Sequence, residues 1–358
     1  MVSLFDPLRI GAWSCPNRIV MAPLTRCRAS AGRVPNALMA GYYADRADAG
    51  LILTEATAVT PMGVGYPDTP GIWSPEQIAC WKMVVEAVHA RGGRILMQLW
   101  HVGRISHPEY LNGELPVAPS AKAPAGEVSL LRPKRSFVTP RALRSEEIPE
   151  LVAAYRQGAA NALAAGFDGV EIHAANGYLI DQFLQDSSNL RSDDYGGSIA
   201  KRARFLLEIT DAVVGVWGAD RVGVHLAPRG DAHDMGDSDP AGLFGYVATA
   251  LGNRRIAFIC TREHRGEDSL SPMLKEKFGG VLIANEGFDR LGAEAWLSAD
   301  KAMAVAFGRD FIANADLVTR LSKQAPLNKL DMKTMYGYGL PDPRVGYTDY
   351  PLLEAEQG

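Results

Sequence analysis

Three residues within six positions, His173, Asn176 and Tyr178, have side chains suited to one chemistry. The N–H groups of a histidine and an asparagine, held side by side, bind and polarise one substrate oxygen. A tyrosine, with an ordinary pKa near 10, donates a proton only when the reaction generates a strong base. Hydride addition to a carbon–carbon double bond, which forms a carbanion or enolate, meets that condition. The alternative is a histidine of the core followed by an Asn-Gly turn.

A second group of residues is suited to binding a phosphate. Gly287 and Gly308 each follow an apolar stretch near the end of the chain, and Arg309 comes directly after Gly308. Backbone N–H groups at a glycine approach a phosphate closely, and an arginine adds a permanent cation. Ordinary turns with a surface arginine are the alternative, which either loop alone would favour.

Other chemistry finds little support in the sequence. The four cysteines form no Cys-x-x-Cys pair, which argues against a disulfide scaffold, a zinc site and an iron–sulfur cluster. The acidic stretch 231–239 lacks the spacing of a standard ligand set, so we expect a solvated loop and no metal. Residues 262–267 and 275–277 are predicted to be charged surface.

Eight short apolar stretches, typical of strands buried on both faces of a parallel sheet, recur along the chain. They are Arg18–Ala22, Leu51–Glu55, Arg94–Gln98, Gly169–His173, Arg221–Leu226, Ile256–Cys260, Gly280–Ala284 and Met303–Phe307. Amphipathic stretches between them predict helices over Glu76–Arg91, Ser145–Ala165, Ser198–Val216 and Asp239–Leu251. Ser145 is the expected N-cap of the second of these.

This alternation predicts one (β/α)₈ barrel over residues 1–358, a fold that typically needs about 250 residues. Met1–Arg18 is expected to cap the barrel bottom, and the proline-rich stretch His101–Arg144 to form a long loop after the third strand. A doubly wound open sheet is the structural alternative. In a barrel, the residues that follow each strand gather at one face, where active sites lie. The two groups described above would meet there.

Composition narrows the partners. The 358 residues are 47% apolar and 22% charged with a formal net charge of −4, which argues against nucleic-acid binding. No stretch reaches the roughly 18 apolar residues of a membrane span. Asp6 and Pro7 stand where a signal peptide needs its apolar core, so a cytoplasmic protein is expected, as a monomer or homodimer.

Over almost its whole length the chain resembles the old yellow enzyme family of flavin-dependent ene-reductases. The motifs that carry the resemblance are Asn17-Arg18-Ile19, Met21-Ala22-Pro23-Leu24-Thr25-Arg26, Gln98-Leu99-Trp100-His101-Val102-Gly103-Arg104, Gly166-Phe167-Asp168-Gly169-Val170-Glu171-Ile172-His173, Asp194-Tyr195-Gly196-Gly197-Ser198, Phe307-Gly308-Arg309 and Gly346-Tyr347-Thr348-Asp349-Tyr350-Pro351. The resemblance implies an enzyme with non-covalent FMN that takes hydride from NADPH or NADH and reduces activated C=C bonds of enones, imides or nitroalkenes.

The resemblance also implies roles for individual residues. The flavin ring and its phosphate would contact Ala22, Pro23, Thr25, Ala56, Gln98, His225, Glu286, Gly287, Gly308 and Arg309. His173 and Asn176 would hold the substrate oxygen, and Tyr178 would donate the proton. Tyr66, Trp100 and Tyr347 would line the substrate pocket.

Two positions depart from the family pattern. His225 stands where the family has an arginine beside flavin N1, and Glu286 stands where many relatives have glycine. A histidine is charged only while protonated, and its reference pKa is near 6.5, so a pH-dependent flavin potential is expected. A nitrate-ester or nitroaromatic reductase, a dienoyl-CoA-reductase-like enzyme and a non-catalytic flavin-binding redox sensor are the alternatives. The physiological substrate, the nicotinamide preference and the stereopreference stay open.

Overall fold

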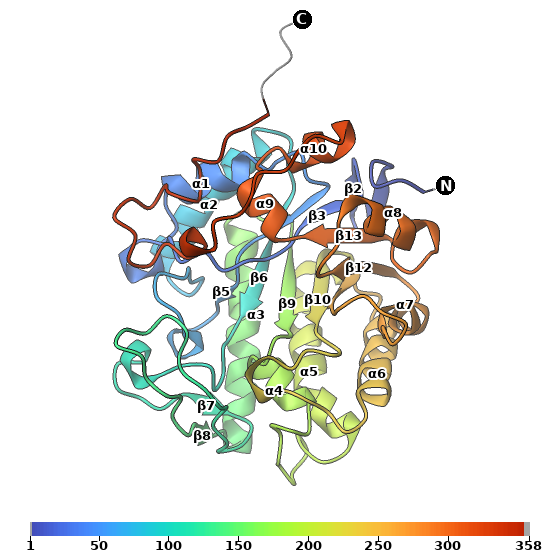
Figure 1. Cartoon of the computed structure of the whole chain (residues 1–358). Coiled ribbons are helices and arrows are strands. Elements are labelled where there is room, and N and C mark those ends of the chain that lie inside the picture. Colours follow the sequence, from blue (N-terminus) through green and yellow to red (C-terminus); the bar gives the residue numbers. More distant parts are fainter. Residues whose placement is uncertain (1, 354–358) are drawn as a thin grey trace, which may run out of the picture.

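A closed parallel barrel forms the centre of the molecule in the computed structural model, which describes residues 2–353 (Figure 1). Its eight strands are β3 (Ile19–Met21), β4 (Leu51–Leu53), β6 (Ile95–Trp100), β9 (Gly169–Ala174), β10 (Val222–Leu226), β11 (Phe258–Arg262), β12 (Val281–Asn285) and β13 (Ala304–Phe307). Each strand pairs in parallel with its neighbours, and the β4–β6 pairing closes the ring. The short β5 (Thr57–Ala58) extends the sheet beside β6. The predicted (β/α)₈ barrel is confirmed.

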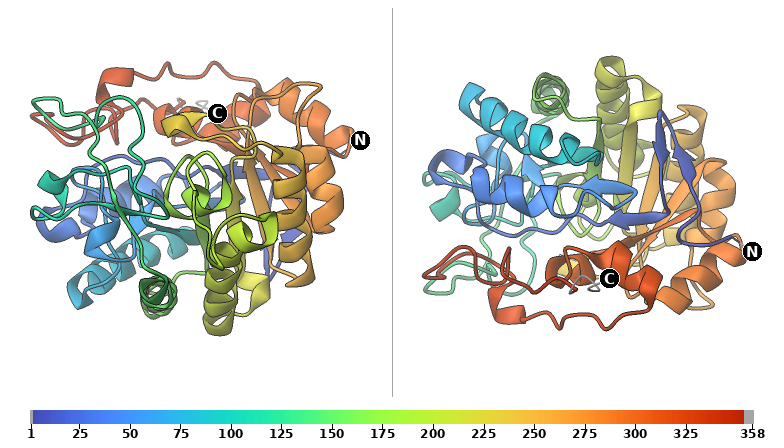
Figure 2. Two further views of the ribbon diagram at one scale, coloured as in Figure 1. Left: turned by 90° about the horizontal axis from the view of Figure 1, so that it is seen from below. Right: turned by 90° about the horizontal axis from the view of Figure 1, so that it is seen from above.

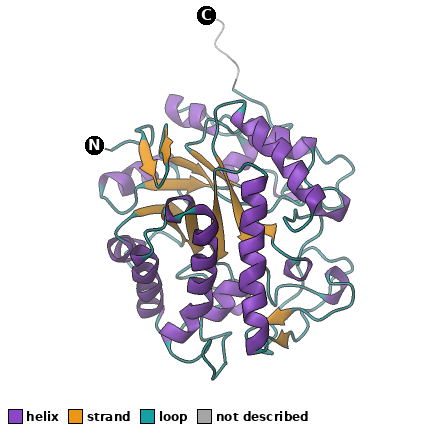
Figure 3. Ribbon diagram, turned by 180° about the vertical axis from the view of Figure 1, so that it is seen from behind, coloured by secondary structure: helices purple, strands orange, loops and turns teal. Residues whose placement is uncertain are grey.

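Helices surround the strands, as Figure 3 shows. They are α1 (Ala37–Ala44), α2 (Pro75–His89), α3 (Ile148–Ala164), α4 (Leu179–Leu184), α5 (Ile199–Trp217), α6 (Pro240–Asn253), α7 (Ser271–Phe278), α8 (Arg290–Ser298), α9 (Arg309–Ala313) and α10 (Leu317–Lys323). The predicted N-cap of α3 is wrong, because Ser145 belongs to a preceding 3-10 turn and its Oγ donates to Asp193 Oδ2 at 2.6 Å. Among residues 2–353, no helix combines the length and apolar character needed to cross a membrane.

The barrel bottom is closed by the N-terminal hairpin of β1 (Leu8–Ile10) and β2 (Trp13–Cys15). The Trp13 indole donates to the carbonyl of Asp168, the residue before β9. Inside the barrel, the inward-facing side chains are tightly packed near the end that the hairpin closes. A Cβ on Gly223 would lie 2.1 Å from the Phe258 ring, so only glycine fits beside that ring. Apolar packing therefore fills the lower interior and leaves polar side chains to the opposite end.

Two segments without long helices flank the opposite end. The predicted loop after β6 is confirmed; it carries a short 3-10 helix (Pro108–Tyr110) and the paired two-residue strands β7 (Val117–Ala118) and β8 (Arg141–Ala142). The segment after α10 runs along one edge of the molecule (Figure 2). Arg28 Nη2 donates to the carbonyls of Thr334 and Val345, which ties this segment to the loop after β3.

Candidate active site

Strand register brings polar side chains from four neighbouring strands to one layer of the barrel interior. His173 on β9 pairs with His225 on β10, which pairs with Cys260 on β11. Gln98 on β6 pairs with Glu171, two residues before His173 and on the same face. All five are buried, with at most 4% of the residue exposed. Because these side chains are shielded from water, any charge among them must be compensated by a neighbouring group.

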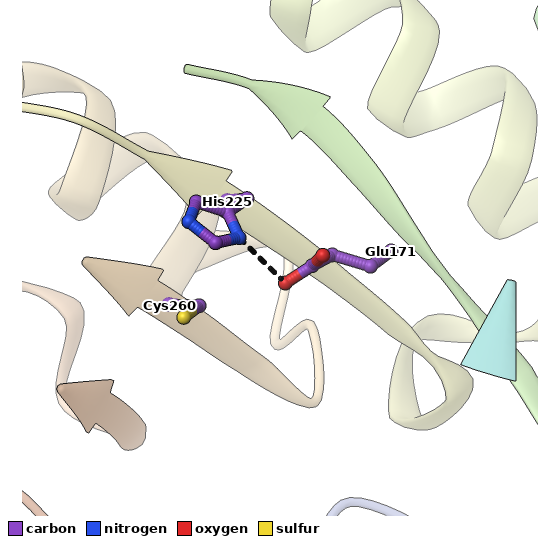
Figure 4. A group of neighbouring side chains, drawn as sticks. All are labelled: Glu171, His225 and Cys260. Atoms are coloured by element: carbon purple, nitrogen blue, oxygen red, sulfur yellow. Dashed lines mark ion pairs between the residues drawn. The ribbon is translucent and has the colours of Figure 1, made fainter. Parts of the chain in front are cut away.

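The compensation within this layer is an ion pair. His225 Nδ1 lies 3.3 Å from Glu171 Oε1 (Figure 4). Gln98 Nε2 donates to the other carboxylate oxygen at 2.7 Å. Burial by itself lowers the pKa of His225, but the nearby Cys260 and the Glu171 carboxylate outweigh it and raise that pKa to about 10. Burial also raises the pKa of the Cys260 thiol, and the neighbouring His225 partly offsets that rise. The titration near neutrality expected from the sequence is therefore wrong for this structure: His225 is cationic at pH 7.

Several polar atoms of this layer have no hydrogen-bond partner among the described residues. They are both ring nitrogens of His225, Nδ1 of His173 and Oε1 of Glu171. The Glu171–His225 contact is thus an attraction between charges without hydrogen-bond alignment. Buried polar atoms without partners are uncommon in proteins and mark places where a bound group completes the hydrogen bonding. Donors and an acceptor at the barrel mouth fit the pyrimidine edge of a flavin, which offers N–H and C=O groups.

His173 and Tyr178 lie against each other at the end of β9, with ring centroids 5.1 Å apart in an edge-on arrangement. Burial, with contributions from the charges of His225 and Arg262, lowers the pKa of His173 well below its usual range, so the ring is neutral. Burial raises the pKa of Tyr178, which keeps its hydroxyl protonated. The two side chains thus offer a neutral N–H donor and a proton.

The turn that joins them uses backbone conformations that favour asparagine and glycine. Asn176 and Gly177 have φ values of +60° and +77°. The turn directs Tyr178 toward Tyr66, with 2.9 Å between the two hydroxyl oxygens, and toward the edge of Trp100 at 5.0 Å between centroids. Tyr66 and Trp100 themselves stack at 5.6 Å. The structure thus brings together the rings of four residues that were predicted to act in catalysis or substrate binding: Tyr66, Trp100, His173 and Tyr178.

Tyr347 is not part of this group. It is 1% exposed and stacks on Tyr42 with 4.0 Å between ring centroids. The guanidinium of Arg28 lies 4.5 Å from its ring centre, in the same contact that ties the C-terminal segment to the loop after β3. This position in the core does not support the role of Tyr347 in lining the substrate pocket.

The remaining predicted flavin residues lie at strand ends around the barrel. Ala22 and Ala56 are buried, whereas Pro23 and Thr25 are half-buried in the loop after β3. Asn285 on β12 pairs with Ala306 on β13, so the turns that contain Gly287 and Gly308 begin side by side. Gly287 has φ of +71°, and Arg309 is exposed. Two adjacent turns with an exposed cation fit a phosphate.

Sequence reasoning missed one residue of the site and misplaced another. Arg262 and Glu263 were expected on a charged surface, but β11 extends to Arg262, and Glu263 is buried between Arg229, Ser269 and Ser271. Because Arg262 follows Cys260 by two positions, it faces the barrel mouth, where it contacts Asn176 and Glu286. The two-residue period of a strand places Arg262 on the same face as Cys260, but the predicted strand ended at Cys260 and so left Arg262 out.

Comparisons with known proteins agree with this geometry. A family profile described as the NADH:flavin oxidoreductase / NADH oxidase family matches residues 3–328. 12-Oxophytodienoate reductase 7 of Oryza sativa subsp. japonica is 45% identical over 98% of this chain and 94% of its own length. A structure of morphinone reductase in complex with tetrahydroNAD shares 46% identity and a TM-score of 0.95, covering 100% and 99% of the two chains. The old yellow enzyme homologue from Zymomonas mobilis shares 44% identity and a TM-score of 0.94, covering 98% and 100%.

Proposed function

The chain belongs to the NADH:flavin oxidoreductase / NADH oxidase family, the old yellow enzyme family, and from this premise we propose that it reduces C=C bonds conjugated to a carbonyl, imide or nitro group. Membership confirms the predicted resemblance, the FMN cofactor and flavin-dependent oxidoreductase activity with a nicotinamide hydride donor. When bound, FMN would supply the hydride transfer between the nicotinamide and the substrate. The substrate class and the roles of the individual residues are the proposal.

The protein's first task is to hold FMN. Gln98 and His225 would bind the pyrimidine edge, where His225 and Glu171 present buried atoms without hydrogen-bond partners. The backbone at Gly287 and Gly308 and the side chain of Arg309 would bind the phosphate, in the two turns that follow β12 and β13. The loop after β3, with Ala22, Pro23 and Thr25, and the buried Ala56 would contact the ring system.

The second task is to draw electron density toward the substrate oxygen. His173 is neutral and buried, and an N–H donor in a site of low dielectric stabilises developing charge more strongly than water does. Asn176 lies three residues after His173, and its carboxamide would supply a second N–H donor. Negative charge that builds up on the oxygen would thus meet two donors, which makes the β-carbon of the double bond an acceptor for hydride.

The third task is to deliver a proton. The Tyr178 hydroxyl is protonated at neutral pH, because burial raises its pKa. It would give its proton to the α-carbon, whose lone pair arises as the double bond accepts hydride at the β-carbon. Tyr66, 2.9 Å away between hydroxyl oxygens, accepts or donates a hydrogen bond and would orient Tyr178 throughout. This proton donor, packed edge-on against His173 and Trp100, is the observation that supports an ene-reductase most directly.

A spectroscopic experiment tests the proposal. The purified holoenzyme should show an oxidised flavin band that bleaches with NADPH or NADH and returns on anaerobic addition of 2-cyclohexenone or N-ethylmaleimide. Separate titrations with each nicotinamide would measure the preference. A flavin band that bleaches but never recovers with any conjugated alkene would refute the ene-reductase, and recovery only with nitrate esters or nitroaromatic compounds would replace its substrate class.

A further inference from the structure

Arg262 connects three strand ends across the barrel mouth. It is the last residue of β11, and its side chain is 41% exposed. One terminal nitrogen, Nη1, donates to Asn176 Oδ1 after β9 at 2.9 Å, and the other, Nη2, donates to Glu286 Oε1 after β12 at 3.2 Å. No part of the substrate chemistry described above requires an arginine at this position.

The contact determines which end of the Asn176 carboxamide faces the site. A guanidinium has five N–H donors and no acceptor, so its partner on Asn176 must be the carbonyl oxygen. With that oxygen bound to Arg262, the NH₂ group is the part of the amide that faces away from Arg262. If the amide turned over, two donors would meet at Arg262 and an oxygen would face the substrate oxygen, which is repulsive at both ends.

Other contacts hold the two partners of Arg262 in place. Asn176 and Glu286 have φ values of +60° and +93°, a region in which non-glycine residues are uncommon and must be held by their surroundings. The backbone oxygen of Asn176 lies 2.9 Å from His233 Nδ1. The Glu286 carboxylate forms an ion pair with Arg262 at 3.2 Å. The three residues therefore form a chain of charge-assisted hydrogen bonds, which are stronger than neutral ones.

We propose that Arg262 is a positioning residue, which fixes the Asn176 carboxamide with its NH₂ group toward the substrate oxygen, and that Glu286 keeps the guanidinium in place. The inference rests on the proposed function, because it assigns Asn176 to the substrate oxygen. It also explains why a glutamate at position 286 is compatible with a turn beside the phosphate site: its side chain is bound to Arg262 and directed to the mouth. The positive charge of Arg262 adds to the effect of burial in lowering the pKa of His173, and it partly offsets the rise that burial causes in the pKa of Tyr178.

Binding of 4-chlorophenol to the oxidised holoenzyme tests the inference. A phenolate stacked on an oxidised flavin gives a long-wavelength charge-transfer band, and its oxygen occupies the place of the substrate oxygen. The variants are Arg262→Met, Asn176→Ala and the two combined. Arg265→Met, which removes another partly exposed arginine three residues further on, is the matched control.

We expect Arg262→Met to weaken phenolate binding about 10- to 100-fold, the range for a hydrogen bond to a charged group. In the Asn176→Ala background the same substitution should have an effect of less than about threefold, because the residue through which Arg262 acts is absent. Glu286→Gln, a second variant that leaves Arg262 in place, should weaken binding about three- to tenfold, again only when Asn176 is present. Arg265→Met should leave binding unchanged.

An equal loss from Arg262→Met with and without Asn176 would overturn the inference, because Arg262 would then act on the ligand by itself. No loss in Arg262→Met or Glu286→Gln, with flavin content and thermal unfolding preserved, would overturn it too. A wild-type protein that carries flavin but shows no phenolate band would instead contradict the proposed oxygen site. The two failures are therefore distinguishable.

Discussion

Strands β6, β9, β10 and β11 present buried polar side chains to the barrel mouth, whereas β12 and β13 end in turns that face solvent. The buried half consists of Gln98, Glu171, His173, His225 and Cys260, of which none is more than 4% exposed. The open half consists of Glu286, Gly287, Gly308 and Arg309, of which Gly287 and Arg309 are exposed. The two halves would bind opposite ends of the same cofactor.

The difference follows from the cost of burying charge. In the buried half, the Glu171 carboxylate and the His225 imidazolium compensate each other, so removing one leaves the other uncompensated in the interior. In the open half, water solvates Arg309, so a substitution that removes this arginine leaves no uncompensated charge in the interior. Substitutions in the buried half should therefore change protonation and stability together with function, while those in the open half should change cofactor affinity alone.

The largest effect should come from Tyr178, the neutral proton donor beside the buried half. Tyr178→Phe keeps the ring against Trp100 and His173 but removes the proton. We expect oxidation of the reduced flavin by 2-cyclohexenone to slow about 10²-fold or more, the range of general-acid effects, with reduction by NADPH nearly unchanged. Stopped-flow measurement of the two half-reactions checks this. Equal slowing of both would mean that Tyr178 is structural.

In the open half, Arg309→Ala should weaken FMN binding about 10- to 100-fold, because an arginine–phosphate hydrogen bond is charge-assisted. Thermal unfolding of the apoprotein should stay the same. Fluorescence titration of the apoprotein with FMN measures the affinity, and Arg144→Ala, at an exposed arginine after β8, is the control. A loss of apoprotein stability in Arg309→Ala would contradict the contrast between the two halves.

Much of this arrangement could be predicted from the sequence, and the failures share a cause. Strand alternation and turn residues indicated the barrel, the turn after β9 and the glycines after β12 and β13. Side-chain contacts across strands could not be predicted, because they depend on register. Glu171 and Cys260 acquire roles only through His225 on β10, and Arg262 only through the residues that follow β9 and β12, Asn176 and Glu286.

The same cause explains the mistaken titration of His225. A lone histidine predicts an ordinary pKa, while a paired carboxylate raises it. Tyr347 shows the converse: its motif placed it at the substrate, but Tyr42 and Arg28, from two other segments of the chain, hold it in the core.

Within the buried half, Glu171→Gln removes the negative charge beside the His225 imidazole and keeps a side chain of similar size. Without the Glu171 carboxylate, burial lowers the pKa of His225 and only Cys260 opposes it, so that pKa should fall from about 10 toward neutrality. Reduction of the flavin, which leaves negative charge at the pyrimidine ring, should then be accompanied by proton uptake at His225. The midpoint potential should depend more steeply on pH between 6 and 8 in the variant than in the wild type.

The apoprotein provides a second readout of the same pair. A pKa raised in the folded state stabilises the protein fully below the unfolded value near 6.5, and that contribution is lost as the pH rises toward 10. The difference in free energy of unfolding between wild type and Glu171→Gln should therefore shrink over this range. Glu147→Gln, at a surface ion pair, is the control. Parallel curves for Glu171→Gln and wild type would show that the pair does not hold the proton.

The smallest effect is expected from His225→Arg, and it tests the same pair from the other side. An arginine is cationic at every accessible pH, and the Glu171 carboxylate and Cys260 already keep His225 cationic to about pH 10. The two proteins should therefore have parallel potential–pH curves between pH 6 and 9, and they should diverge only above that range, where His225 loses its proton and the arginine does not. Redox titrations of both proteins measure this. Curves that separate near pH 6.5 would show that His225 titrates like an unpaired histidine, and the protonated Glu171–His225 pair would then be wrong.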